Sequence, residues 1–182
     1  MSRMLEIDDS ALVVVDVQGK LAELMHDKET LFKNIEILIR SAKILGIPII
    51  WCQQTPTALG ATIPRIARLL EGLEPIDKAT FSCFAHQPFA DKLKSLERPQ
   101  VILSGIEAHI CIYQTAADLL KEGYSVDVIA DAVSSRIKKN KKVGLKRIEK
   151  IGANVSSTEM ALFELLKTAE HPQFKQIVKL VK

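Results

Sequence analysis

The chain alternates between short apolar runs and longer segments in which apolar residues recur every three or four positions. Ala11–Asp16 is a β-branched run bounded by polar residues, which is the pattern of a strand buried on both faces. Similar runs occupy Ile47–Cys52, Gln100–Ser104, Tyr124–Ala130 and, more briefly, Ala153–Val155. Each of these runs is predicted to be a β-strand.

Helical patterns lie between these runs. Thr30–Leu45 places its apolar residues on one stripe and ends at Gly46, a residue type that commonly terminates helices. The other segments with helical spacing are Ile63–Glu71, Ile110–Lys121, Val143–Ile151, Met160–Leu166 and Pro172–Lys182. Alternating strands and helices predict right-handed crossovers and a parallel sheet. We therefore expect a single domain over residues 1–182 with a doubly wound, Rossmann-like α/β fold: a parallel sheet of five to six strands with helices on both faces.

The composition narrows the class of protein. Apolar residues make up 47% and charged residues 26% of the chain, which is close to globular averages and excludes disorder as the dominant state. The net charge of +3 is too small to indicate a nucleic-acid or membrane partner by itself. No apolar run approaches the roughly 18 to 20 residues that span a bilayer, and the first residues contain no apolar signal core. We expect a cytoplasmic protein without a membrane partner.

The three cysteines differ in their surroundings. Cys52, Cys83 and Cys111 cannot all pair within one chain, and their spacing matches no zinc motif. Cys111 follows a predicted strand and opens a predicted helix, where free backbone N–H groups and the helix dipole favour a thiolate. Free cysteine is otherwise a small, often buried hydrophobic residue. Cys111 is thus the candidate nucleophile.

Two charged residues could act with this cysteine. In an open parallel sheet, ligands bind outside the carboxyl ends of the strands. Asp16 ends the first predicted strand and is either a turn-forming residue or a base, and Lys78, in a predicted loop, is either solvated or catalytic. Together with Cys111 they would suit acyl transfer, because the carboxylate takes the thiol proton, the ammonium stabilises charge and the sulfur attacks a carbonyl.

Three segments of the chain resemble the signature segments of the isochorismatase-like cysteine hydrolases. They are Val14–Gln18, Lys78–Ser82 and Gly105–Ala116, of which the last is the most specific. The resemblance extends from about Ser10 to Phe163. Nicotinamidases and carbamoylsarcosine amidohydrolases belong to the same superfamily.

The resemblance implies a role for each of the three residues. Cys111 would be the nucleophile that forms an acyl-enzyme, Asp16 would be the general base, and Lys78 would hold both in an electrostatic network. The family has a non-proline cis peptide bond, which in this chain would join Ile106 and Glu107. The resemblance also implies that the backbone amides of Glu107 and Cys111 form the oxyanion hole.

Two departures from the family's better-known members narrow the expected activity. Nicotinamidases carry a metal site of Asp and His residues after the second strand, whereas this chain reads Trp51–Pro56 there with neither His nor carboxylate. We therefore expect no metal and no other cofactor. Isochorismatases that cleave a vinyl ether lack the nucleophilic cysteine, so Cys111 indicates a small amide, carbamoyl or related acyl substrate.

Four further residues are candidate substrate contacts. Gln18 and Gln53 could recognise an amide, and Phe81 could form an apolar wall, although aromatic residues near strand ends more often belong to the core. His109 lies two residues before Cys111 and either lines the pocket or stabilises a turn.

The partners of the chain are open to more than one interpretation. Arg136–Lys150 holds eight basic residues and one acid, Glu149, which is typical of a solvated helix face but could also contact an anionic substrate, a nucleic acid or another subunit. The alternatives to an enzyme are a catalytically silent scaffold or binding protein of the same fold and, with less support, a nucleic-acid-binding protein. Family members commonly assemble, so the resemblance implies a homo-oligomer, a dimer or larger.

Overall fold

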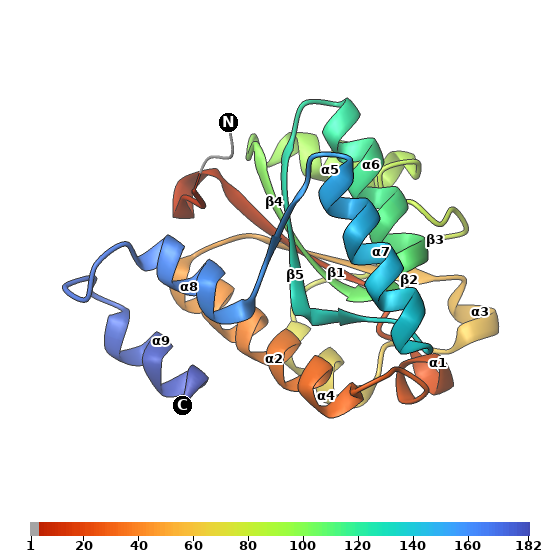
Figure 1. Ribbon diagram of the computed structural model, residues 1–182, viewed down its shortest axis with the longest axis horizontal. Coiled ribbons are helices and arrows are strands. Elements are labelled where there is room, and N and C mark those ends of the chain that lie inside the picture. Colours follow the sequence, from red (N-terminus) through yellow and green to blue (C-terminus); the bar gives the residue numbers. More distant parts are fainter. Residues whose placement is uncertain (1–3) are drawn as a thin grey trace.

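A computed structural model describes residues 4–182 of the chain, and this part contains six strands that form one parallel sheet (Figure 1). The strands lie in the order β3-β2-β1-β4-β5-β6. Their bounds are β1 Ser10–Val15, β2 Ile49–Gln54, β3 Ile76–Lys78, β4 Gln100–Ile106, β5 Ser125–Ser134 and β6 Asn154–Ser156. The predicted doubly wound α/β fold is confirmed.

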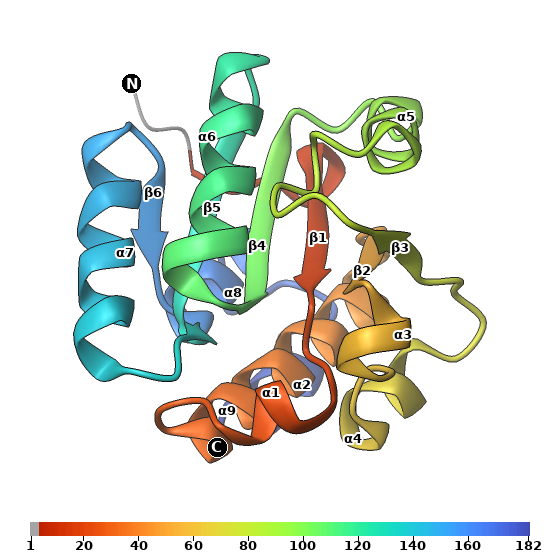
Figure 2. The ribbon, with the colours of Figure 1, turned by 90° about the vertical axis from the view of Figure 1, so that its right-hand side faces the viewer.

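Helices cover both faces of this sheet (Figure 2). The α-helices are α1 Gly19–Glu23, α2 Lys28–Leu45, α3 Pro56–Leu59, α4 Pro64–Ala67, α5 Gln87–Ser95, α6 Tyr113–Lys121, α7 Lys138–Lys150, α8 Thr158–Leu166 and α9 Phe174–Val181. Short 3-10 turns are η1 Ile7–Asp9 and η2 Arg68–Leu70, and η3, Ala108–Ile112, is a π-helical turn.

The alternation along β1 divides the core into two apolar layers. Leu12 and Val14 face one layer, to which α2, α8 and α9 contribute, while Val13 and Val15 face the other, to which α5, α6 and α7 contribute. All six residues of β1 are buried, as its β-branched run predicts for a central strand of a parallel sheet. None of the helices within residues 4–182 is both long enough and apolar enough to cross a bilayer.

Two local predictions are wrong. Lys78 does not lie in a loop, because Ile76–Lys78 pairs with β2 as the short edge strand β3, with Lys78 in register with Gln54. The helix predicted over Val143–Ile151 begins five residues earlier, at Lys138. A three-residue strand that carries two charges has no periodic apolar signal, and neither has the basic first turn of α7.

The chain reverses its winding direction at β1, which pairs with β2 on one side and β4 on the other. This is the topological switch point of the sheet, and a crevice opens there beyond the carboxyl ends of the strands. Asp16 directly follows β1, and η3 follows β4. The fold therefore brings two of the three predicted catalytic residues to the same crevice.

Candidate active site

Three separate elements deliver Asp16, Lys78 and Cys111 to this crevice. Asp16 is the first residue after β1 and has a left-handed backbone with φ of 54°, a conformation that Asp tolerates better than most residues. Lys78 is the last residue of β3, and Cys111 lies in the π-helical turn η3. All three side chains are buried.

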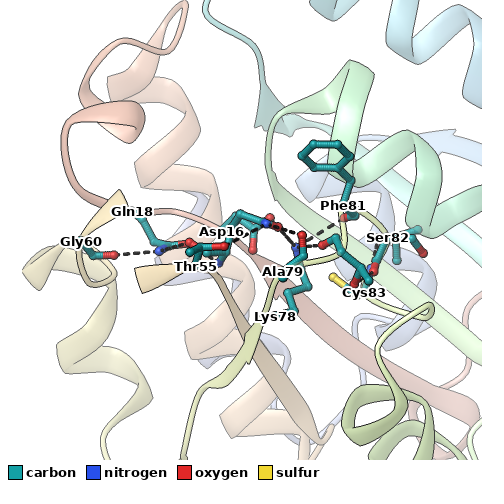
Figure 3. A network of polar contacts seen from close by, with 12 residues as sticks. Asp16, Gln18, Thr55, Gly60, Lys78, Ala79, Phe81, Ser82 and Cys83 are labelled. Carbon is teal, nitrogen blue, oxygen red and sulfur yellow. Dashed lines mark hydrogen bonds and ion pairs between the residues drawn. The ribbon is translucent and has the colours of Figure 1, made fainter. Parts of the chain in front are cut away.

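The Lys78 ammonium is the centre of a polar network (Figure 3). Its Nζ donates to Asp16 Oδ2 at 2.8 Å and to Gln54 Oε1 at 2.7 Å. The carbonyl oxygens of Thr80 and Phe81 also accept from it, at 3.1 and 3.4 Å. Burial lowers the pKa of the Lys78 ammonium, whereas nearby Cys83, Asp16 and Cys111 raise it. The net shift is upward, so the ammonium stays protonated.

The two oxygens of the Asp16 carboxylate have different environments. Oδ2 is held by Lys78, whereas Oδ1 is buried and accepts no hydrogen bond of standard geometry. The Cys111 thiol interacts with this carboxylate. Burial raises the pKa of Asp16, while the positive charge of Lys78 opposes that rise. Oδ1 is therefore the carboxylate oxygen that Lys78 does not bind.

The structure corrects one expectation about Cys111. Burial and the adjacent Asp16 carboxylate raise the pKa of the Cys111 thiol well above its ordinary range, although Lys78 acts in the opposite direction. The sequence had suggested a thiolate favoured by a helix start, but Cys111 lies inside the π-helical turn that precedes α6, next to a negative charge. The raised pKa favours a thiol over a thiolate at Cys111.

Close backbone packing fixes the turn that carries Cys111. Gly105 has a φ of 117°, and a side-chain carbon there would lie 2.0 Å from the Val15 carbonyl oxygen, so only glycine fits. On the other side, Gly144 of α7 lets the backbone of Ala108 and His109 approach closely. The Ile106–Glu107 peptide bond is cis, as the family resemblance implied.

A cavity of about 110 Å³ lies against Cys111 and Asp16. Apolar side chains form most of its wall. They are Leu21, Leu59, Phe81, Ile106 and Ile110, and the remaining lining residues are Gln54 and Glu107. Phe81, a residue that is 55% exposed, therefore borders the cavity, and its contact with a substrate stays a prediction.

Glu107 lines the cavity, and its carboxylate points to the neighbouring strand end. Its Oε1 accepts hydrogen bonds from the backbone N–H of Arg136 at 3.0 Å and from the Arg136 Nε at 3.2 Å. This ion pair ties the turn before Cys111 to the end of β5. The role of the Glu107 and Cys111 amides as an oxyanion hole stays a prediction.

The predicted contacts of Gln18 and Gln53 with substrate do not fit the structure. The Gln18 amide donates to the carbonyls of Gln54 and Gly60 and accepts from the Gln54 N–H, so a fully buried side chain has all its groups engaged (Figure 3). Gln53 accepts from Thr62 and donates to Asp77. Both glutamines hold the loops around the site and do not border the cavity.

His109 also points away from the cavity. Its Nδ1 lies 2.9 Å from Ser135 Oγ, and its Nε2 lies 3.5 Å from Asn140 Nδ2. These contacts join η3 to Ser135, directly after β5, and to Asn140 in the first turn of α7. The structural alternative that the sequence left open, a histidine that stabilises a turn, is the one that this geometry supports.

Gln54 is the site residue that sequence reasoning missed. It borders the cavity, accepts from Lys78 and donates through Nε2 to the carbonyl of Ala79 at 2.8 Å. The signal lay in the strand alternation, because Gln54 and Gln53 point to opposite faces and only one of them can reach Lys78. Within residues 4–182, no three His, Cys, Asp or Glu side chains form a metal-binding group, and metal-free chemistry stays a prediction.

Comparison with known proteins identifies the family of this chain. Residues 10–160 match the isochorismatase domain family. The chain belongs to the isochorismatase family. Isochorismatase domain-containing protein 2 of Danio rerio is 39% identical over 173 residues, which cover 94% of this chain and 86% of that protein.

Two further relatives of this isochorismatase-family chain cover nearly all of it. The secreted isochorismatase effector Isc1 of Phytophthora sojae (strain P6497) is 37% identical over 179 residues, or 95% of this chain and 84% of that protein. The solved structure named MAR1 ribonuclease from Caenorhabditis elegans has a TM-score of 0.92 and 38% identity, covering 98% of this chain and 92% of that one. The family fold is a hydrolase fold, and cytoplasmic location stays a prediction.

Proposed function

We propose that the protein is a metal-independent cysteine hydrolase that acts on a small, uncharged amide, carbamoyl or related acyl compound. One observation carries this proposal: Cys111 lies beside Asp16 at the wall of a small cavity, and the Asp16 oxygen that Lys78 leaves unpaired is the natural acceptor for the thiol proton. Membership of a hydrolase family supports the same assignment.

The reaction would begin with proton transfer. As Cys111 Sγ bonds to the substrate carbonyl carbon, its proton moves to Asp16, and the carbonyl oxygen takes the negative charge. The amides of Glu107 and Cys111 would donate to that oxyanion. Collapse of the tetrahedral intermediate breaks the carbon–nitrogen bond, and the leaving amine takes the proton from Asp16. Throughout, the Lys78 ammonium keeps the carboxylate in place and offsets its charge.

Deacylation would reverse these roles. Asp16 removes a proton from water, the hydroxyl attacks the thioester carbon, and the thiolate of Cys111 leaves and recovers the proton. The products are a carboxylic or carbamic acid and the regenerated thiol. Because the resting thiol has a raised pKa, catalysis depends on Asp16 at both steps.

The cavity limits the substrate. Pockets for drug-sized molecules measure about 300 to 1,000 Å³, so a cavity of about 110 Å³ suits a molecule of a few heavy atoms. Its walls are mostly Leu, Ile and Phe side chains, and Glu107 is already paired with Arg136. An anionic or strongly polar group would lose its hydration there without gaining partners. The non-reacting part of the substrate is therefore small and apolar.

A second candidate function is the cleavage or binding of RNA. It is favoured by the name of the Caenorhabditis elegans relative and by the basic helix α7, which packs against η3. Binding of this kind would weaken steeply with salt and would not depend on Cys111. The small cavity favours the first candidate. A catalytically silent scaffold remains the third possibility, and it predicts a Cys111 that never becomes acylated.

Assembly into a homo-oligomer, a dimer or larger, stays part of the proposal. We also expect a small-molecule substrate, no cofactor and a cytoplasmic location.

The decisive experiment measures turnover of small neutral amides and N-carbamoyl compounds by ammonia release. The wild-type protein should hydrolyse at least one of them, and Cys111→Ala should reduce the rate at least about 10³-fold because the nucleophile is lost. Cys52→Ala is the matched control, since Cys52 is another buried thiol but does not border the cavity, and it should retain turnover.

Two results would contradict the proposal. One is hydrolysis that survives in Cys111→Ala. The other is cleavage of an RNA oligonucleotide that is equally fast in wild type and Cys111→Ala, which would favour the second candidate.

A further inference from the structure

A second pocket lies at the opposite end of the sheet from Cys111. It measures about 310 Å³ and is lined at the amino ends of β5 and β6 by Asp127, Asn154 and their neighbours. Asp127 is the third residue of β5 and is in register with Asn154, the first residue of β6. Because the strands are parallel, this edge is remote from the carboxyl ends that form the active site.

Three carboxylates line this pocket, and no Lys or Arg does so in the part of the chain that the structure describes. Asp127 comes from the sheet, Glu149 from the last turn of α7 and Glu164 from α8. Glu164 Oε2 accepts from the backbone N–H of Leu5 at 3.1 Å, and no Lys or Arg within residues 4–182 forms an ion pair with it. Glu149 is exposed at the rim.

Asp127 is the feature that distinguishes this pocket from an ordinary acidic surface. Its side chain is 4% exposed; the Asn154 side chain hydrogen-bonds to the carboxylate, but Oδ2 has no hydrogen-bond partner. A buried carboxylate oxygen without a partner destabilises the fold. Ile129, two residues along the same strand and on the same face, shows that an apolar side chain fits this layer of the core. Asp127 thus stands where the fold alone would favour a hydrophobic residue.

The pocket wall also contains apolar surface. Met4 and Met160 lie on it, and both side chains are 58% exposed. Methionine side chains adapt to a flexible aliphatic partner. A metal ion is not indicated, because no three His, Cys, Asp or Glu side chains among the described residues form a metal-binding group.

We propose that this pocket binds an organic ammonium ligand, a short aliphatic amine or diamine whose charged group lies against Asp127 and whose stem lies against Met4 and Met160. The ammonium supplies the hydrogen bonds that Asp127 Oδ2 lacks, and Glu149 and Glu164 add to the attraction. This proposal does not depend on the hydrolase assignment, because none of these residues borders Cys111.

The probe for the experiment is 1,4-diaminobutane, titrated calorimetrically into the ligand-free protein at low ionic strength. Butane-1,4-diol is the neutral control of matched shape, and KCl at the same ionic strength is the control for screening. Wild type should show saturable binding of the diamine and none of the diol. Cys111→Ala should bind equally well, because the active site is not involved.

Two variants test the pocket itself. Asp127→Asn keeps the shape of the side chain and should weaken binding about tenfold or more, as expected for loss of a charged hydrogen bond. Glu149→Gln lies on the exposed rim, cannot disturb the core, and should weaken binding a few-fold. If Asp127→Asn does not fold, Glu149→Gln decides the question. Any of three results would overturn the proposal. They are binding that KCl abolishes to the same extent in all variants, binding that is unchanged in both variants, and no binding at millimolar diamine.

Discussion

Two buried aspartates lie at opposite ends of the same sheet, and only one of them has a cationic partner. Asp16 is 2% exposed at the carboxyl end of β1 and pairs with Lys78 at 2.8 Å. Asp127 is 4% exposed near the amino end of β5, and its Oδ2 has no partner. Burial raises the pKa of both; the pKa of Asp127 reaches about 6, because a hydrogen bond with Asn154 only partly offsets burial and Glu164 raises it further. Burial alone therefore does not distinguish the proposed catalytic carboxylate from Asp127; its cationic partner does.

The largest effect should come from removing the partner of Asp16. Lys78→Met leaves a buried carboxylate alone and should lower the free energy of unfolding by about 3 to 5 kcal/mol near neutral pH. Protonating an ordinary carboxyl at pH 7 costs about 4 kcal/mol, which sets the same scale. Urea unfolding followed by circular dichroism measures the loss.

The pH dependence and a double variant sharpen this test. Without Lys78, the folded-state pKa of Asp16 lies further above its unfolded value, so stability is retained at low pH and is lost as the pH rises through the folded pKa. In Asp16→Asn/Lys78→Met the unpaired charge is gone, and much of the lost stability should return. A Lys78→Met protein as stable as wild type at every pH would show that the pair is not coupled.

Removing the unpaired charge of Asp127 should have a smaller effect of opposite sign. The Asp127 pKa is raised from 3.8 to about 6, so stability is highest below the unfolded pKa and falls between about pH 4 and 6. Asp127→Asn should therefore raise the free energy of unfolding at pH 7 by about 1 to 3 kcal/mol. It should also make that free energy depend less on pH between about pH 4 and 6. Chemical unfolding at several pH values measures both.

Glu164→Gln is the matched control for this effect. It removes only the repulsion by which Glu164 raises the pKa of Asp127. It should therefore raise the free energy of unfolding at pH 7 by less than Asp127→Asn does. If Asp127→Asn destabilised the protein while Glu164→Gln was neutral, the hydrogen bond with Asn154 would outweigh the cost of burying Asp127, and the contrast between the two aspartates would be lost.

The sequence predicted most of the sheet because buried parallel strands are continuous apolar runs. Ala11–Asp16 corresponds to β1 Ser10–Val15, and Gln100–Ser104 to β4 Gln100–Ile106. It did not predict β3, because three residues with two charges have no pattern of their own and form a strand only by pairing with β2.

The sequence predicted some residues of the candidate site but not all of its features. Asp16, Lys78 and Cys111 come from three motifs, and the structure brings them together around one cavity and one network. Gln53 is the predicted substrate contact, but its neighbour Gln54 borders the cavity, because successive residues of a strand point to opposite faces. The raised pKa of Cys111 depends on burial next to Asp16, which residues far apart in the sequence create only after folding.

The most direct test of the central claim is to detect an acyl group on Cys111. Folded protein is treated with 4-nitrophenyl acetate near neutral pH, and peptide mass mapping locates the acetyl group over time. Cys111 should be acetylated first, Cys52 and Cys83 should stay unmodified, and Asp16→Asn should slow the reaction about 10² to 10⁴-fold because the general base is gone. Equal labelling of the three cysteines, or a rate at Cys111 that Asp16→Asn leaves unchanged, would contradict the assignment of an Asp16–Cys111 nucleophile.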